Sequence, residues 1–343
     1  MIPDAPRARR TGHVRALRLF LLAVVALALA PGTFLRAPGQ MRSDPAQITV
    51  TPRIAQGKVT GALERPDGVW ELTSAHGFFG GFSALVARDG PALIAGSDRG
   101  FLFDIDLAGE VPRPVPGSFR FVGVSTRGRK EFVDLEALAR DPATGTLWAA
   151  FENDNLVMCF PPQGGRSVHA PPDIADWSAN SGPETIERLA DGRFLMIAEG
   201  NIRGDRRLHE ALLYPGDPAE GGTPPLAFRF FGSPYFDPVD ATQLPDGRVL
   251  ILLRLVDFSI PATFNTAIAI ADPRGIRAGG SWEARVIAHM HDGILAENFE
   301  GIAYVPSDAD PRKGSVWLIS DDNFSIFQRT LLVRFAWDGS IAP

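Results

Sequence analysis

Short apolar stretches separated by turn residues recur along most of the chain. Each unit begins with a polar residue in an apolar stretch, passes through a turn rich in Pro, Asp and Gly, and continues into a second apolar stretch. Two such stretches joined by a short turn predict a β-hairpin. We call the polar residue at the start of each unit the anchor. The five anchors, spaced 53, 48, 56 and 60 residues apart, are Ser83, Glu136, Glu184, Asp240 and Glu300.

A repeat of this length leaves room for two further strands outside each hairpin. Apolar stretches in suitable places lie at 212–214, 226–231, 267–270, 284–288 and 331–337. Four-stranded units repeated every ~50 residues predict a β-propeller with blades around a central channel. The remaining residues, 301–343 and 41–82, suffice for one average blade and closing strands. We therefore expect an all-β propeller with five blades, with six blades as the second choice and a β-sandwich as the alternative fold.

The first forty residues have a different pattern from the repeats. Five arginines precede an uncharged apolar run at 19–30, which is the order found in secretory signals. Small residues at 28–30 suit cleavage, whereas Pro31 hinders it, so an uncleaved membrane anchor stays open. We expect 1–40 to be a signal peptide or anchor and 41–343 to be a single propeller domain. The domain would lie in the periplasm or elsewhere outside the cytoplasm, either soluble or tethered to the inner membrane.

Composition narrows the function classes. The chain has 35 Gly and 29 Pro, which argues against a helical bundle, and its single cysteine, Cys159, excludes an intramolecular disulfide. The net charge of −6 becomes −11 once 1–40 is removed, and only three lysines are present. Such a surface has no electrostatic footprint for nucleic acid, and an anionic substrate would need local arginines or a bridging cation. We expect a monomer that acts on a small anionic or ester substrate.

The anchors are candidate metal ligands. Because the innermost strand of each blade lines the channel, residues at equivalent points of those strands would converge on one axis. Four carboxylates and one hydroxyl in a narrow channel would repel one another strongly without a cation. Calcium accepts six to eight oxygen ligands in flexible geometry. The sequence therefore predicts an axial Ca²⁺ held by Ser83, Glu136, Glu184, Asp240 and Glu300; a water-filled channel with solvated acids is the alternative.

A second group of polar residues follows the second apolar stretch of every unit. Arg99 and Arg254 are candidate anion clamps, since a guanidinium holds phosphate or carboxylate in a fork. Asp98 and Glu152 are candidate general bases. Ordinary solvated turns are the alternative interpretation. The candidate substrate-binding residues in this group are Asn153, Glu199, Asp321 and Asn323.

Several motifs, taken in order, resemble the phytase-like family of exported bacterial proteins, also described as "esterase-like activity of phytase". The resemblance spans roughly 55–340. It implies an exported protein, whereas the family name does not define the reaction. The chain departs from the family pattern around Glu184, where Glu-Gly is usual, and around Asp240. The motifs lie at 80–85, 97–100, 134–139, 180–184 and 297–301.

The order of the anchors is also similar to that of the calcium-activated apyrase family of nucleotidases. Those enzymes are five-bladed propellers with an axial calcium held by Ser and Glu residues of successive blades. The analogy implies calcium binding by the same five anchors, with Asp240 where a serine is expected. It carries no overall sequence match, so it supports the metal more than the reaction.

Three functions remain open at this point. The first is a calcium-dependent hydrolase of phosphate esters or anhydrides, in which the arginines neutralise charge and a carboxylate acts as base. The second is a carboxylic-ester or lactone hydrolase that uses the same site. The third is a non-catalytic periplasmic binding module in which calcium is structural.

Overall fold

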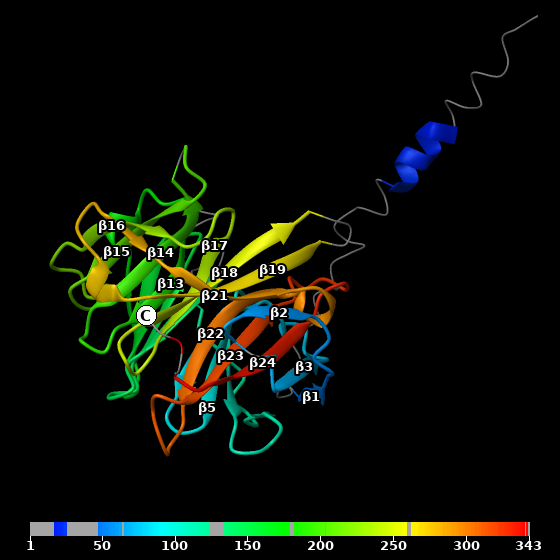
Figure 1. Cartoon of the computed structure of the whole chain (residues 1–343), viewed down its shortest axis with the longest axis horizontal. Helices are drawn as coiled ribbons and strands as arrows, with labels where there is room; N and C mark the ends of the chain where they lie inside the picture. The colour runs from blue at the N-terminus through cyan, green and yellow to red at the C-terminus, as the bar shows by residue number, and fades with distance from the viewer. Residues whose placement is uncertain are drawn as a thin grey trace, which may run out of the picture.

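Five β-sheets arranged in a ring make up the body of the protein (Figure 1). The structure, a computed structural model, describes residues 17–25, 47–63, 65–123, 134–178, 182–202, 204–258, 262–339 and 341. The innermost strands of the five sheets contact one another in sequence order, and the last contacts the first. The predicted all-β propeller with five blades is therefore confirmed, and the six-bladed and sandwich alternatives are wrong.

Blades 1 and 2 follow the simple meander that the hairpin pattern predicts. Blade 2 has four antiparallel strands, and blade 1 carries a short additional strand that pairs with its third strand. Blade 1 contains β4 (Phe82–Arg88), β5 (Ala92–Ser97), β6 (Phe101–Asp106), β7 (Arg113–Pro114) and β8 (Arg120–Phe121). Blade 2 contains β9 (Leu135–Arg140), β10 (Leu147–Phe151), β11 (Leu156–Phe160) and β12 (Ser167–His169).

Blades 3 and 4 each borrow a strand from elsewhere in the chain. A strand from the blade 4 region pairs in parallel with the outer strand of blade 3. Blade 3 contains β13 (Pro183–Arg188), β14 (Phe194–Asn201), β15 (Leu208–Tyr214), β16 (Leu226–Phe231) and the borrowed β20 (Ser281–Glu283). Blade 4 contains β17 (Asp237–Gln243), β18 (Val249–Asp257), β19 (Thr263–Ala271), β21 (Arg285–His291) and the N-terminal β2 (Lys58–Gly61).

Blade 5 closes the ring by pairing the two ends of the chain. Its inner strands β22 (Asn298–Pro306), β23 (Gly314–Asp321) and β24 (Thr330–Trp337) come from the C-terminal part. Its outer strands β3 (Gly68–Ser74) and β1 (Ile48–Pro52) come from the N-terminal part. Backbone pairing of β3 with β24, and of β2 with β21, satisfies edges that would otherwise be open. Three short 3₁₀ turns lie in loops: η1 (Pro172–Ile174), η2 (Pro273–Gly275) and η3 (Gly293–Leu295).

The core consists of apolar layers between neighbouring blades. Side chains of alternate strand residues face the next sheet, as in the layer that joins Ala84 and Leu102 of blade 1 to Leu138 and Met158 of blade 2. Full burial of a large apolar side chain contributes roughly 1.5–3 kcal/mol. The inner strands are buried along almost their whole length, so they hold the residues at their ends in fixed positions.

The N-terminal segment can be compared with the structure only in part. Residues 17–25 form a helical segment, while the rest of the predicted signal or anchor at 1–40 lies outside the described residues. Within the described part of the chain, no helix has the length and apolar character needed to cross a membrane.

Candidate functional site

Each innermost strand carries a β-bulge close to its N-terminal end. A β-bulge inserts one residue that has no partner on the neighbouring strand, and its side chain is thereby re-aimed. In all five blades the pairing between the first and second strands skips one residue at this point. The skipped residues are Ser83, Glu136, Glu184, Val239 and Glu300. Four of the five predicted anchors are therefore structurally equivalent.

In blade 4 the equivalent residue is Val239, and the predicted anchor Asp240 lies one position later. Val239 is fully buried in the apolar core. The alignment of the fourth repeat was therefore wrong by one residue, because Asp240 is the polar residue nearest to the bulge but does not occupy it.

A polar cavity of about 290 Å³ lies at the end of the inner strands where the bulges are. The second strands of the blades run toward this end, so the residues at or just after their ends meet the bulge residues there. Of the described residues, eight carboxylates, one arginine and one amide line the cavity. They are Asp98, Asp134, Glu136, Glu152, Glu184, Glu199, Glu300, Asp321, Arg254 and Asn323. The two predicted groups of polar residues thus form a single site.

Asp134 was missed by the sequence reasoning, although a signal was present. It stands two residues before the anchor Glu136, and alternate residues of an extended chain point to the same side. Burial raises the pKa of Asp134, while hydrogen bonds with Glu136 and Asn153 lower it. Asn153, predicted to bind substrate, donates its side-chain N–H to Asp134 instead of lining the cavity.

Ser83 and Asp240 are held by backbone groups of neighbouring blades. The Ser83 hydroxyl donates to the Leu135 carbonyl of blade 2 at 2.5 Å. Asp240 accepts from the Ile302 N–H of blade 5 at 2.7 Å and from the Ala241 N–H at 2.8 Å. Neither residue is among the described residues that line the cavity. The predicted roles of Ser83 and Asp240 as metal ligands therefore have no support from their positions, whereas the other three anchors line the cavity.

Arg99 is not among the described residues that line the cavity, and it is held among aromatic rings. Its guanidinium carbon is 3.3 Å from the centre of the Phe324 ring and 5.9 Å from that of Phe78. One of its N–H groups donates to the Gly77 carbonyl at 3.2 Å. The predicted role of Arg99 as an anion clamp therefore has no support from its position, whereas Arg254, the other predicted clamp, lies on the cavity wall.

Arg254 is the cation inside the site. It forms ion pairs with Glu199 and Glu300 and donates to the Asn298 side-chain oxygen at 3.2 Å. Burial alone would lower the pKa of Arg254, but Glu300, Glu199 and Glu184 outweigh that effect and raise it. Its Nε is buried and has no hydrogen-bond partner among the described residues. Arg254 is therefore permanently charged and offsets only part of the carboxylate charge.

The carboxylates far from Arg254 retain protons more strongly than usual. Burial raises the pKa of Asp98 to about 8, and burial raises that of Glu152 to about 7. For Glu136, burial and then the neighbouring Glu184 and Glu300 raise the pKa well above its ordinary value. Desolvation and like charges therefore both disfavour ionisation here, and a cation would reverse this preference.

Two glycines allow the carboxylates to approach the inner strands. Gly182 donates its N–H to Glu152 at 3.2 Å, and a Cβ added there would lie 2.6 Å from the Asn155 side-chain oxygen. Gly81 has φ +65°, and a Cβ on it would overlap the carboxylate of Asp98. A side chain at either position would displace the wall of the cavity.

The donor atoms of the site fit a hard divalent cation. Two sets of three carboxylates have one oxygen from each member within 4.8 Å of the others, and the sets share Glu152. Oxygen-only, flexible coordination by carboxylates is what calcium prefers, and magnesium accepts a smaller number of the same ligands. The two sets are Asp134, Glu136 and Glu152, and Glu152, Glu184 and Glu199.

Comparison with known proteins identifies a family. The family model "Phytase-like: Esterase-like activity of phytase" matches residues 78–324. No curated protein matches the chain.

Similar solved structures share little sequence with this chain. A nidogen/laminin complex chain is 11% identical and covers 80% of this chain and 95% of its own, with a TM-score of 0.39. A streptogramin B lyase is 9% identical, with 84% and 98% covered and a TM-score of 0.37. A catalytically inactive virginiamycin B lyase from Staphylococcus aureus with quinupristin is 11% identical, with 84% and 99% covered and a TM-score of 0.39. At these values the structures carry no argument about function.

Proposed function

The chain belongs to the phytase-like family, and on that premise we propose that it is a calcium-dependent hydrolase of phosphate esters or anhydrides. The observation that carries the proposal is the pair of carboxylate sets that share Glu152 inside one polar cavity with Arg254. Carboxylates that would otherwise stay protonated gain their charge when a cation arrives, so cation binding and ionisation favour each other.

The cation would be held on the side of blades 2 and 3. Glu136 and Glu184 are bulge residues of these blades, and Asp134 and Glu152 lie next to them. A bound divalent cation supplies charge neutralisation and Lewis-acid polarisation of a phosphoryl oxygen. Because the inner strands are rigid, the carboxylates that they carry are already oriented before substrate enters.

Arg254 would orient the substrate anion from the opposite side. Its guanidinium is anchored by Glu199 and Glu300, so its position is fixed before binding. A fixed guanidinium recognises phosphate oxygens by direction as well as by charge. A substrate held by the cation on the acidic side and by Arg254 on the other would have one defined orientation.

Glu152 is the better candidate for the general base, and Asp98 for the general acid. In the metal-free protein burial raises the pKa of Glu152 to about 7; a bound cation would favour its ionised form, which can accept a proton, and the Gly182 N–H orients one of its oxygens. A pKa of about 8 keeps Asp98 protonated under the same conditions, so it can donate to a leaving group. Two carboxyl groups with separated pKa values can divide the proton transfers in this way.

A carboxylic-ester or lactone hydrolase is the second candidate, because the family description names esterase-like activity. The same residues would act on a carbonyl, with Arg254 facing the developing oxyanion. The third candidate, a binding module, would use the cavity without turnover. We also propose export to the periplasm or another compartment outside the cytoplasm, supported by the arginines and the apolar run within 1–40.

Turnover of aryl substrates distinguishes these candidates. The chelator-treated protein is assayed with p-nitrophenyl phosphate and p-nitrophenyl acetate, with and without millimolar calcium. We expect calcium-dependent hydrolysis of the phosphate, and a loss of 100-fold or more in kcat in Glu152→Gln. Glu187→Gln is the matched control, since Glu187 is a carboxylate of β13 outside the cavity lining.

The other outcomes each have a clear meaning. Hydrolysis of the acetate alone would favour the esterase. If wild type and Glu152→Gln show the same background on both substrates, the hydrolase proposal fails and the binding module stands.

A further inference from the structure

Large apolar side chains are exposed on one region of the cavity-bearing face. We call this set the apolar rim, and it belongs to blades 4 and 5. Single exposed apolar residues are ordinary on a protein surface, but grouped ones mark an interaction site. The members and their exposed fractions are Ile54 (78%), Tyr235 (65%), Phe258 (91%), Ile326 (58%) and Phe327 (50%).

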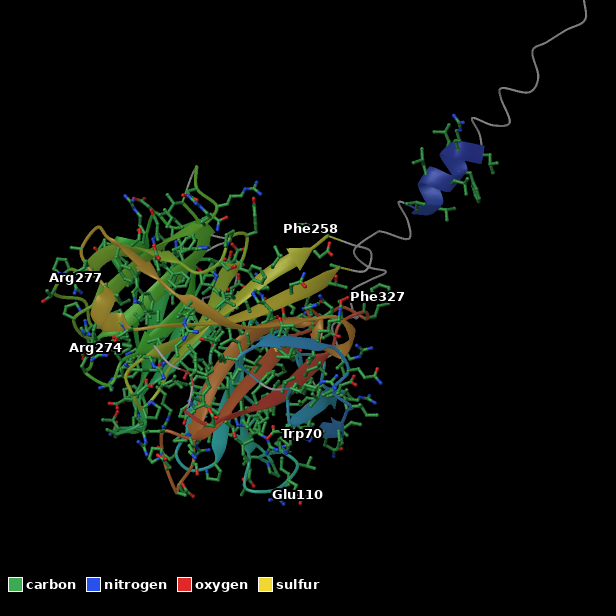
Figure 2. The ribbon with its side chains drawn as sticks, viewed as in Figure 1. Trp70, Glu110, Phe258, Arg274, Arg277 and Phe327 are labelled. Atoms are coloured by element: carbon green, nitrogen blue, oxygen red, sulfur yellow. The ribbon has the colours of Figure 1, made fainter. Side chains whose placement is uncertain are left out.

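Strand directions place Phe258 and Phe327 of the rim on the same face as the cavity. β18 passes Arg254 at the cavity wall and continues to Asp257, which pairs with Thr263, so Phe258 stands in the tip of this hairpin. β23 ends at the cavity residue Asp321, and Phe327 lies in the loop that follows. Glu110 lies in the loop between β6 and β7 at the opposite end of blade 1, and Figure 2 shows it far from Phe258 and Phe327.

The rim borders an open groove that contains two arginines. The groove has a volume of about 710 Å³, and its lining includes Arg53, Ile54, Ile294 and Arg329. Arg329 pairs with Glu297 at 2.9 Å, and its side chain is 49% exposed. Arg53 pairs with Glu71 at 2.5 Å, and its side chain is 46% exposed. Apolar side chains and guanidinium groups therefore line the same groove.

The N-terminal part of the chain enters the propeller on this face. Ile48 pairs with Ser74, the last residue of β3, and β3 runs toward the cavity end of blade 5. The helical segment at 17–25 consists mainly of Leu, Val and Phe, whose side chains are 44–67% exposed.

From these observations we propose that the face of blades 4 and 5 docks on the surface of a lipid bilayer. Aromatic side chains at exposed loop tips suit the headgroup region, where an apolar ring and a polar surrounding are both satisfied. Arg53 and Arg329 would face lipid phosphates, and the apolar helical segment would provide the second attachment. Two weak attachments together give the stable membrane binding that neither provides alone. The cavity then opens toward the bilayer, whatever reaction it performs.

Site-specific fluorescence in vesicles tests this docking directly. The full chain, in a Cys159→Ala background, carries a single new cysteine at Phe258→Cys, Phe327→Cys or Glu110→Cys, labelled with an environment-sensitive dye. Each protein is reconstituted with phosphatidylcholine vesicles that contain nitroxide-labelled lipid. We expect emission at positions 258 and 327 to rise severalfold with unlabelled lipid and to be quenched by the nitroxide, with no change at position 110.

A second variant separates the contribution of the rim to vesicle binding from that of the helical segment. Phe258→Ser combined with Phe327→Ser alters only exposed side chains, and circular dichroism verifies its fold. We expect its cosedimentation with vesicles to fall about tenfold relative to wild type. The proposal is overturned if dyes at 258 and 327 respond as the dye at 110 does, or if the full chain does not associate with vesicles. In either case the rim would instead be a candidate binding site for a protein partner.

Discussion

Blade 4 differs from the other four blades at the one position where the repeat is most regular. Blades 1, 2, 3 and 5 place Ser83, Glu136, Glu184 or Glu300 at the bulge, whereas blade 4 places Val239 there. From the adjacent strand of blade 4, however, comes the only arginine among the described residues that line the cavity.

The difference shows how one site can have two electrostatic halves. On the side of blades 2 and 3, carboxylates face carboxylates, and their pKa values are raised. On the side of blades 4 and 5, Arg254 already pairs with Glu300 of blade 5, and it also pairs with Glu199 of blade 3, which lies between the two halves. The first side therefore has no cation of its own among the described residues, while the second side has Arg254.

The largest effect is expected when the built-in cation is removed. Arg254→Met would leave Glu199 and Glu300 desolvated and without a partner, so we expect the free energy of unfolding to fall by about 3–5 kcal/mol at pH 7. Urea denaturation measures this. Arg193→Met is the control, because Arg193 pairs with Asp191 at the surface, where the two side chains are 34% and 53% exposed, and should cost about 1 kcal/mol or less. Equal losses in the two variants would remove the distinction between the halves.

The next effect concerns calcium stabilisation on the acidic side. At a calcium concentration 100 times its Kd, we expect about 2.7 kcal/mol of stabilisation in wild type. Glu184→Gln should abolish most of it, because the substitution removes a charged ligand from the shared carboxylate set. Thermal melting with and without calcium is the readout. Glu187→Gln, three residues along the same strand, should keep the full calcium effect; a loss of equal size there would contradict the assignment.

The stability of the metal-free protein should change with pH in the direction opposite to that caused by ordinary surface acids. Burial raises the pKa of Asp98 and of Glu187 to about 8 and that of Glu152 to about 7. The native state then holds protons that the unfolded state releases near pH 4–5. The contribution of these groups to the free energy of unfolding is therefore full below about pH 4. It declines as pH rises toward 8, by about 1.4 kcal/mol per pH unit for each retained proton.

Thermal melts of the metal-free protein between pH 5 and pH 8 test this sign. Saturating calcium should flatten the decline, since it favours the ionised carboxylates. Stability that rises over the same range without calcium would show that the cavity acids ionise freely.

The smallest effect is expected at the serine anchor. Ser83→Ala removes the hydrogen bond to the Leu135 carbonyl and leaves that buried oxygen without its donor, at a cost of about 1–3 kcal/mol at most. Calcium stabilisation should be unchanged, because the hydroxyl joins blades 1 and 2 outside the cavity lining. A reduced calcium effect would instead restore the predicted role of Ser83 as a ligand.

The repeat pattern alone was enough to predict the fold. The regular spacing of the hairpins determines the blade number. The fifth blade is completed by pairing between the two ends of the chain, as β3 pairs with β24. Four of the five anchors were correctly predicted to occupy equivalent positions, because polar residues are rare in these apolar strands, whereas their role as metal ligands stays a prediction.

Other features depend on three-dimensional geometry that no local pattern encodes. A bulge shifts the strand pairing by one residue and leaves no signal in the sequence. Asp240 was therefore predicted as the anchor of blade 4, although Val239 is the structurally equivalent residue. The anchors and the second group of polar residues were predicted as two separate groups, and only the strand directions show that they share one cavity. The stacking of Arg99 on Phe324 joins loops of two blades and was equally invisible.

Calorimetric titration of calcium into the metal-free full chain at pH 7.5 tests the central claim most directly. Run in two buffers of different ionisation enthalpy, it gives both the stoichiometry and the protons released. We predict one calcium per chain, net proton release from the cavity carboxylates, and no detectable binding in Glu136→Gln. Absence of binding in wild type, or equal binding in Glu136→Gln, would contradict the account.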